Sequence, residues 1–157
     1  MGGTYTQLFV HLVWATRGRA PLLEGVMERR VYAVIRGRCR AAGGLVLAIG
    51  GTRDHVHVLV RIPTTISIAA LAKSLKGGSA YTANHHAEGP FRIRWQSGYG
   101  AFTVCRRHVA AVVEYIRNQP AIHAARRTKP ALERTQPPPP PRQALPLRSA
   151  EPSSRGS

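Results

Sequence analysis

Residues 52–62 read TRDHVHVLVRI, and their alternation predicts a β-strand whose two faces differ in chemistry. Successive side chains of a strand point to opposite faces of its sheet. One face would carry the apolar residues Val56, Val58, Val60 and Ile62. The other face would carry His55, His57, Leu59 and Arg61. Because the apolar face is complete by itself, the core does not need the two histidines, which project side by side, close enough to bind one metal ion. Closely spaced histidines are also common by chance, so a metal site requires a third ligand from elsewhere in the chain.

The segments around this strand predict a ferredoxin-like fold. Alternating and β-branched residues predict further strands at 7–15, 45–51 and 94–104, and helical periodicity predicts helices at 24–44, 67–86 and 106–119. The order β-α-β-β-α-β-α is that of an α+β, ferredoxin-like split β-α-β fold with an added C-terminal helix. Its four-stranded antiparallel sheet would have helices on one face, so the histidines would lie on the open face.

The composition changes near residue 120. Nine of the twelve prolines lie in residues 120–157, and this stretch has almost no aromatic or β-branched residues. Such a composition cannot bury a core. We therefore predict one folded domain at residues 1–123 and a Pro/Arg-rich, disordered tail at residues 124–157.

The charge of the chain indicates a polyanionic partner. It has 23 Lys and Arg against 7 Asp and Glu, a formal net charge of +16, and 20 of the cations are Arg. The planar guanidinium of Arg pairs with phosphate, so nucleic acid is the first partner to consider. The two cysteines are far apart, and no apolar stretch reaches the length of a membrane span. We therefore expect a cytoplasmic protein with no membrane partner.

The predicted helix at 106–119 carries a tyrosine beside its apolar stripe. The stripe consists of Val109, Val112, Val113 and Ile116, at the spacing of an amphipathic helix. Tyr115 and Gln119 lie one turn apart on its flank, separated by about 40° around the helix axis. The two side chains can therefore reach the same point in space.

Together these motifs resemble the single-tyrosine HUH transposases of small bacterial insertion sequences, a family that includes REP-associated tyrosine transposases. The shared signature is a His–hydrophobic–His strand, here DHVHVLV at 54–60, and a tyrosine helix, here YIRNQ at 115–119. Further similarities are HLVWATRGRAPLL, AIGGTRDHVHVLVRIP, LKGGSA and WQSGYGAFTV. The resemblance covers roughly residues 4–123.

The resemblance implies a DNA transposase that cuts and rejoins single-stranded DNA through a 5′-phosphotyrosine intermediate, moving an insertion sequence without ATP. By position in the motifs, Tyr115 would be the nucleophile. His55, His57 and Gln119 would bind a divalent metal, Mg²⁺ or Mn²⁺, and the mixed nitrogen and oxygen donors suit Mn²⁺ somewhat better.

The resemblance also implies partners. These are single-stranded DNA with hairpin ends and a second copy of the chain, in a homodimer with composite active sites. The candidates for DNA contact are Arg17, Arg19, Lys73 and Lys76. The protein would be nucleoid-associated in the bacterial cytoplasm when bound to DNA.

Two other functions stay open at this point. A catalytically silent nucleic-acid-binding module on the same fold would use the positive charge and the open sheet face. A domesticated relative would cut repetitive palindromes instead of moving an element. The chain also departs from the family at Pro120, because a proline disfavours helical conformation in the residue before it. We therefore expect the helix to end at Gln119, which would affect the position of that side chain.

Overall fold

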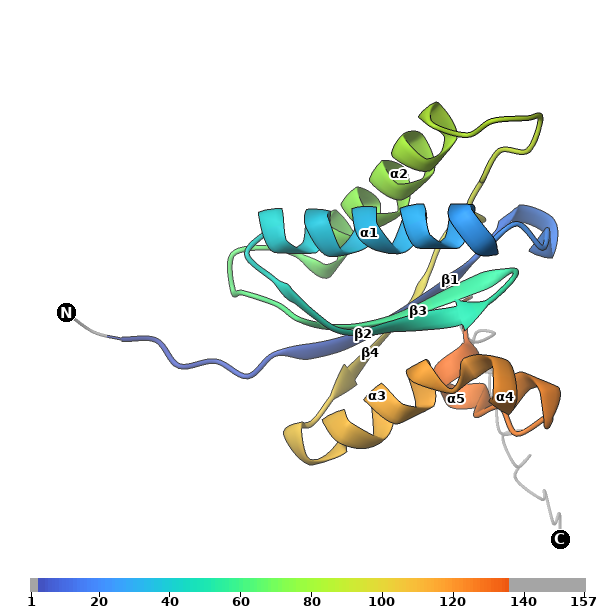
Figure 1. Cartoon of the computed structure of the whole chain (residues 1–157). Coiled ribbons are helices and arrows are strands. Elements are labelled where there is room, and N and C mark those ends of the chain that lie inside the picture. Colours follow the sequence, from blue (N-terminus) through green and yellow to red (C-terminus); the bar gives the residue numbers. More distant parts are fainter. Residues whose placement is uncertain (1–2, 136–157) are drawn as a thin grey trace, which may run out of the picture.

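The computed structural model describes residues 3–135, in which a four-stranded sheet lies between two layers of helices (Figure 1). The strands are β1 (Phe9–Ala15), β2 (Leu45–Thr52), β3 (His55–Arg61) and β4 (Gly100–Val104). The helices are α1 (Gly25–Ala41), α2 (Ile68–His85), α3 (Val109–Arg117), α4 (Gln119–Ala124) and α5 (Pro130–Glu133), with short 3₁₀ turns η1 (Arg17–Arg19) and η2 (Arg106–His108). Within this part of the chain, no helix has the length and apolar character that crossing a membrane would require.

The sheet has the ferredoxin-like strand order β2-β3-β1-β4, and each neighbouring pair is antiparallel. This confirms the fold class predicted from the sequence. β3 is an inner strand, with β1 on one side and β2 on the other. In this register His57 lies opposite Val13 of β1 and Gly50 of β2. The paired histidines therefore lie at the start of an inner strand, which hydrogen bonds fix on both sides.

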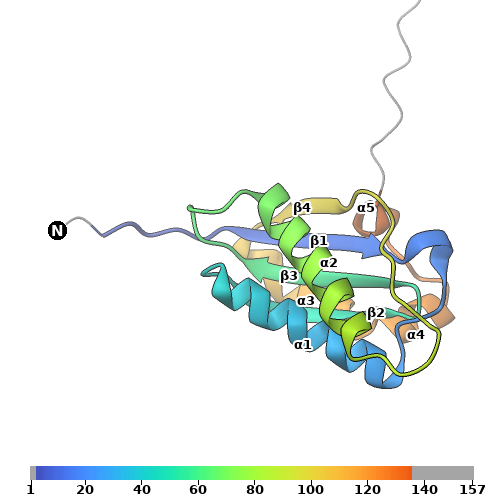
Figure 2. The ribbon, with the colours of Figure 1, turned by 90° about the horizontal axis from the view of Figure 1, so that it is seen from above.

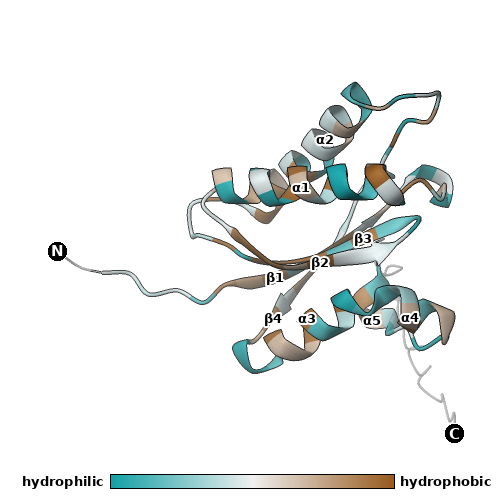
Figure 3. Ribbon diagram, in the orientation of Figure 1, coloured by the Kyte–Doolittle hydropathy of each residue, from teal (hydrophilic) through white to brown (hydrophobic). Residues whose placement is uncertain are grey.

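The predicted alternation of β3 is confirmed. Its even-numbered residues belong to one core between the sheet and helices α1 and α2, together with Trp14, Ile35 and Leu75. Leu59, on the histidine face, belongs to a second core with Val112 and Ile116 of α3. Figure 2 shows α1 and α2 crossing the first face side by side, and Figure 3 shows the apolar residues along the central strands between the two helical layers.

The prediction of an open histidine face is wrong, because helices cover this second face of the sheet. Helices α3, α4 and α5 lie across it (Figure 1), and α3 contacts both β2 and β3. The reason is the apolar stripe of α3, whose Val112 and Ile116 are buried against Leu59. The histidine face is therefore a second buried interface, and the helix that carries Tyr115 forms its other side.

The helix that carries Tyr115 ends earlier than predicted, and a second helix follows it directly. α3 ends at Arg117, Asn118 adopts a non-helical conformation, and α4 begins at Gln119 with Pro120 in its first turn. A proline is well tolerated in the first turn, where its missing N–H has no helical partner. Pro120 therefore starts a new helix instead of ending the chain's helical path.

Gly50 of β2 allows α3 to approach the sheet closely. A Cβ at this position would collide with the main-chain carbonyl oxygen of Ile116. No rotamer change relieves a clash with backbone, so any larger residue must push the helix away. The absence of a side chain at Gly50 thus sets the distance between β2 and the helix that carries Tyr115.

We predict that Gly50→Ala lowers the free energy of unfolding by about 1–3 kcal/mol, the usual cost of inserting a methyl group into a packed interface. Urea unfolding followed by circular dichroism measures this change. The matched control is Gly77→Ala in α2, where a Cβ meets nothing within 4 Å. That change should raise stability by about 0.5–1 kcal/mol, because alanine is the better helix former. Equal stabilities of Gly50→Ala and wild type would contradict the close approach.

Candidate metal centre

His55 and His57 lie side by side on β3 and are almost completely buried. Their exposed fractions are 1% and 0%, and their ring centroids are 5.0 Å apart. Because helices α3 and α4 cover this face, the rings face a protein-lined site and not solvent. Buried imidazoles need hydrogen-bond partners. The partner of His55 is Asp54, and the partner of His57 is His11.

The orientation of His55 is set by Asp54. Asp54 Oδ1 lies 2.7 Å from Nδ1 of His55 and also accepts a 2.8 Å hydrogen bond from Thr52 Oγ1. Burial would raise the pKa of Asp54, but the hydrogen bonds from His55 and Thr52 outweigh it and lower the pKa. An ionised carboxylate can only accept, so Nδ1 of His55 carries the hydrogen and Nε2 presents its lone pair to the site.

The orientation of His57 is set by His11 of β1. His11 Nε2 lies 2.9 Å from Nδ1 of His57, and the two rings stack with centroids 5.0 Å apart. Burial, together with the neighbouring His57, lowers the pKa of His11 to about 3, and burial also lowers the pKa of His57. Both rings are therefore neutral at physiological pH, as metal ligation requires. Nε2 of His57 is buried and faces the site, where Oε2 of Glu133 lies 3.3 Å away.

Gln119 reaches the same site from the first residue of α4. Its side chain is fully buried, and Oε1 lies 3.3 Å from Nε2 of His55, although the two residues are 64 positions apart in the sequence. The side chain of Gln119 therefore stays within reach of His55 although Pro120 follows it directly. The helix break falls at Asn118, one residue before Gln119, and the turn at Asn118 directs the amide toward the histidines.

Tyr115 approaches the site from the last turns of α3, in the same chain as the histidines. Its ring lies edge-on to His57, with centroids 6.1 Å apart. The hydroxyl accepts a 3.0 Å hydrogen bond from the main-chain N–H of Lys129 and donates one to Oε1 of Glu133. Burial and the bond to Glu133 raise the pKa of Tyr115. The resting group is therefore a phenol, held in one orientation by two partners.

Glu133 and His123 belong to this site, and the sequence reasoning missed both roles. Oε2 of Glu133 lies 3.3 Å from Nε2 of His57, 3.6 Å from Nε2 of His55 and 3.7 Å from Nε2 of His123. Burial would raise the pKa of Glu133, but the neighbouring His57, Tyr115 and His55 lower it to about 2. One signal was available: Glu133 is the only acidic residue in the basic stretch 124–135.

The disordered tail predicted from residue 124 does not begin there. Residues 130–133 form α5, and Lys129 and Glu133 both contact Tyr115. Composition indicates only that a segment cannot form a core of its own, and this segment is held by hydrogen bonds to the site instead. The division of the chain at residue 123 otherwise stays a prediction, and residues 136–157 lie outside the described part of the structure.

The donor atoms fit a divalent ion. The nearest ligand atoms of His55, His57 and Glu133 all lie within 4.8 Å of one another. In an octahedral site with bonds of about 2.1 Å, adjacent ligand atoms are about 3 Å apart. Three separations are close to this value: 3.3 Å from Nε2 of His55 to Oε1 of Gln119, and 3.3 Å and 3.6 Å from Oε2 of Glu133 to Nε2 of His57 and of His55. The otherwise unpartnered Nε2 of His57 supports the same interpretation.

The four cations proposed for DNA contact are not equivalent. Arg17, Arg19 and Lys73 are exposed, and Arg19 also forms a 3.6 Å ion pair with Asp54. Lys76 is different, because its ammonium donates to the main-chain oxygens of Gln96 and Gly98. Its partial burial lowers its pKa. Lys76 therefore holds the connection before β4 in place.

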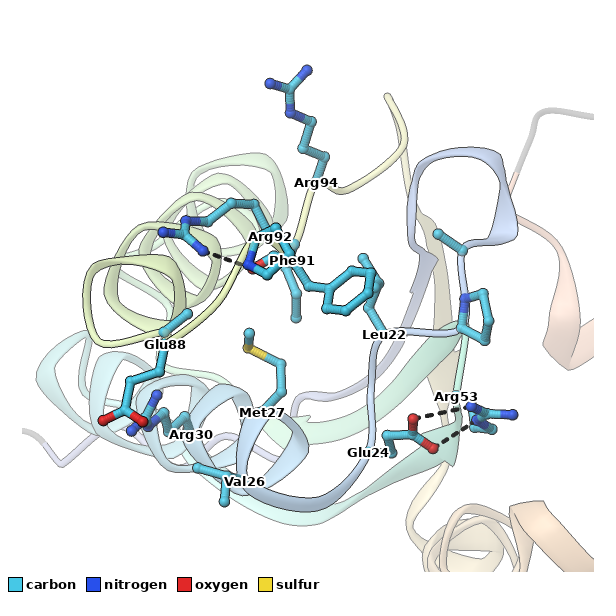
Figure 4. Close-up of a pocket in the computed structure, with 15 residues that line it drawn as sticks. Leu22, Glu24, Val26, Met27, Arg30, Arg53, Glu88, Phe91, Arg92 and Arg94 are labelled. Carbon is cyan, nitrogen blue, oxygen red and sulfur yellow. Dashed lines mark hydrogen bonds and ion pairs between the residues drawn. The ribbon is translucent and has the colours of Figure 1, made fainter.

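A separate groove lies on the α1–α2 side of the sheet (Figure 4). It has a volume of about 1080 Å³, and its floor contains Leu22, Met27 and Ile93 beside an exposed Phe91. Four arginines border it, namely Arg30, Arg53, Arg92 and Arg94. Because Arg17 N–H donates to the carbonyl of Arg94, the exposed cations of η1 continue this border.

Comparison with known proteins identifies the class. Residues 4–119 match the family model of IS200-like transposases. The transposases of insertion sequence element IS200 from Salmonella typhimurium and Salmonella typhi are each 29% identical over 114 residues, covering 69% of this chain and 74% of the relative. The chain belongs to the IS200-like transposase family.

Solved structures agree with this assignment. A protein from Deinococcus radiodurans R1 described as a transposase has a TM-score of 0.60 and 27% identity, covering 76% of this chain and 95% of that chain. A REP-associated tyrosine transposase bound to a REP hairpin has a TM-score of 0.59 and 16% identity, covering 78% of this chain and 73% of that one. At that identity the second likeness shows the fold alone.

Proposed function

We propose that this transposase cleaves and rejoins single-stranded DNA at the ends of an insertion sequence, through a covalent bond between Tyr115 and a 5′-phosphate. The observation that supports this most directly is the convergence of four side chains from β3, α3 and α4. The Tyr115 hydroxyl lies beside the paired His55 and His57, and the Gln119 amide reaches the same point. A nucleophile next to a metal-type donor set is the arrangement that phosphodiester cleavage needs.

In the proposed reaction, the Tyr115 oxygen attacks the scissile phosphorus in line with the 3′ oxygen. The bond from phosphorus to the tyrosine forms, the bond to the 3′ oxygen breaks, and that oxygen takes up a proton as the phenol loses one. The reverse reaction by another 3′-OH seals a new junction. Because each phosphodiester is exchanged for a phosphotyrosine, the bond energy is conserved and no nucleotide cofactor is needed.

His55, His57 and Gln119 would hold the divalent ion, Mg²⁺ or Mn²⁺. The bound ion would supply Lewis-acid stabilisation of charge on the phosphate. The protein itself supplies the orientation. Asp54 and His11 fix the two imidazoles with Nε2 toward the site. Helices α3 and α4 cover the site and exclude bulk water from it. The neutral donors leave the positive charge of the ion largely available to the DNA phosphate.

For DNA contact we propose the exposed cations of η1, Arg17 and Arg19, together with the arginine-bordered groove that they continue (Figure 4) and Lys73 on α2. The related REP-associated transposase was solved with a hairpin bound, which supports a hairpin-ended substrate for this chain. The net charge of +16 supports a polyanionic partner in the same way. A DNA-acting role fits the cytoplasmic, nucleoid-associated location that we propose.

We also propose that the chain acts as a homodimer, but its active sites need not be composite. Tyr115, Gln119 and Glu133 all contact the histidine site of their own chain. The exchange of the α3 helix between subunits, which would make the sites composite, stays a prediction, and the mixing experiment below tests it.

The alternative of a silent nucleic-acid-binding module has less support than catalysis. That hypothesis used the open sheet face as a binding platform, and α3, α4 and α5 cover this face (Figure 1). A domesticated relative that cuts repetitive palindromes would use the same site chemistry. The two cutting functions differ in their substrate and not in the residues described above.

We predict that Tyr115→Phe abolishes the covalent protein–DNA product and leaves DNA binding intact, because only the attacking oxygen is removed. The assay incubates the protein with Mn²⁺ and labelled single-stranded DNA spanning the flanks of its gene, followed by denaturing electrophoresis. Tyr81→Phe, at an exposed tyrosine of α2, is the matched control and should form the product normally. A wild-type protein that binds hairpin DNA without ever forming the product would favour the silent module.

We predict that Mn²⁺ raises the melting temperature of the wild-type protein and that His57→Ala removes this increment. Ligand at 100 times its Kd stabilises the folded state by about 2.7 kcal/mol. Differential scanning fluorimetry with and without Mn²⁺ measures the increment separately from any loss of basal stability. His85→Ala, at an exposed histidine that ends α2, should keep the full increment. An unchanged increment in His57→Ala would exclude this histidine as a ligand.

We predict that a mixture of Tyr115→Phe and His57→Ala chains, each inactive alone, stays inactive after co-refolding. Each chain then lacks one part of its own site, and sites formed within single chains cannot complement each other. The measurement is the yield of covalent DNA product from the mixture. Recovery of a substantial fraction of wild-type product would instead demonstrate composite sites with exchanged tyrosine helices.

A further inference from the structure

The C-terminal segment Lys129–Thr135 returns to the sheet after α4 and passes beside the histidine site. Figure 1 shows its helix α5 on the same face of the sheet as α3, and Figure 2 shows α5 at the β4 side of the sheet, with α4 at the β2 side. The segment lies against β4 at Gly100, where a Cβ would collide with the main-chain oxygen of Arg134. A glycine at this position of β4 therefore leaves room for the backbone of the C-terminal segment.

The two carboxylate oxygens of Glu133 have different partners. Oε1 accepts the hydrogen bond of the Tyr115 hydroxyl. Oε2 faces the Nε2 atoms of His57 and His55 at 3.3 Å and 3.6 Å. The side chain of Glu133 thus contacts both the Tyr115 hydroxyl, the proposed nucleophile, and the histidines that would hold the ion. Its exposed fraction is only 18%, so both oxygens act inside the protein.

We propose that Glu133 is a residue of the catalytic centre, with Oε2 completing the divalent-ion site of His55, His57 and Gln119 and Oε1 holding the Tyr115 hydroxyl at its edge. This inference rests on the proposed function. The C-terminal segment is then part of the active centre and not a dispensable extension of the domain.

The chemistry of the donor set supports this role. His55, His57 and Gln119 are neutral, whereas Mg²⁺ and Mn²⁺ are hard cations that favour carboxylate oxygen. Glu133 supplies the one anionic donor that the other three residues lack. Because only Oε2 faces the ion site, the carboxylate occupies one coordination position and leaves others for phosphate oxygens. Nε2 of His57, which faces Oε2 of Glu133 at 3.3 Å, would then share the ion with this oxygen.

The second oxygen positions the nucleophile. The Tyr115 hydroxyl donates to Oε1 and accepts from the N–H of Lys129, so both its donor and its acceptor functions are engaged by the same segment. The ammonium of Lys129, which belongs to the same segment, lies 5.6 Å from the centre of the Tyr115 ring. Docking of Lys129–Thr135 therefore fixes where the attacking oxygen points.

The test is Mn²⁺ binding to the full chain in the absence of DNA, measured from the free-ion signal in electron paramagnetic resonance. Glu133→Gln keeps the shape of the side chain and removes its charge, and we expect Mn²⁺ affinity to fall by about tenfold or more. Gly100→Ala keeps the carboxylate but displaces the segment that carries it, and should lower affinity in the same direction. Glu114→Gln, at an exposed glutamate of α3, is the matched control and should bind Mn²⁺ as wild type does.

Cleavage kinetics provide the second measurement. For Glu133→Gln we expect kcat to fall by about tenfold or more at saturating Mn²⁺, with little change in the KM for DNA, because the loss concerns the reacting groups. Unchanged Mn²⁺ affinity in this variant would overturn the ligand role. Faster cleavage with tighter DNA binding would overturn the proposal in favour of a carboxylate that blocks the site. Reduced Mn²⁺ affinity in a protein that never forms the covalent product would retain Glu133 as a ligand and reject the proposed function instead.

Discussion

Strand β3 is hydrogen-bonded to a neighbour on each side and packed against helices on each face, so its side chains have no freedom to exchange faces. A slip of one residue would send the valines to the histidine side and the histidines into the main core. The pairing of His57 with Val13 and Gly50 excludes this slip on both sides at once. The core and the candidate metal centre are therefore two results of one register, and neither can change without the other.

His55 and His57 both direct Nε2 toward the site, but different hydrogen-bond partners hold their rings. His55 is held by the ionised Asp54, and His57 is held by the neutral ring of His11. In both, the remaining nitrogen faces the same site. Burial alone would leave such groups unsatisfied, at a cost of about 1–3 kcal/mol for each polar atom without a partner. The polar neighbours offset part of this cost, and a bound ion would offset the rest.

The sequence was sufficient to predict the fold and the positions of four site residues, because these depend on local periodicity and on motifs. Alternation placed His55 and His57 on one face. Helical spacing predicted that Tyr115 and Gln119 share one flank of a single helix, whereas the structure divides them between α3 and α4 at Asn118. The covered sheet face was not predicted, since nothing in one segment shows which face of the sheet the α3 stripe will cover. The contribution of Glu133 was hidden for a related reason. It depends on a return of the chain that is held by a few hydrogen bonds and leaves no periodic pattern.

The separation between the histidine-bearing sheet and the tyrosine helix is determined at Gly50, where the main chain of β2 meets the main chain of Ile116. Two backbones in contact define a distance that side-chain substitutions elsewhere on the helix do not alter. A centre built in this way tolerates sequence divergence around it, because its spacing does not depend on the volume of any particular core residue. This suits a family whose fold is retained in a solved relative that shares only 27% of its residues with this chain.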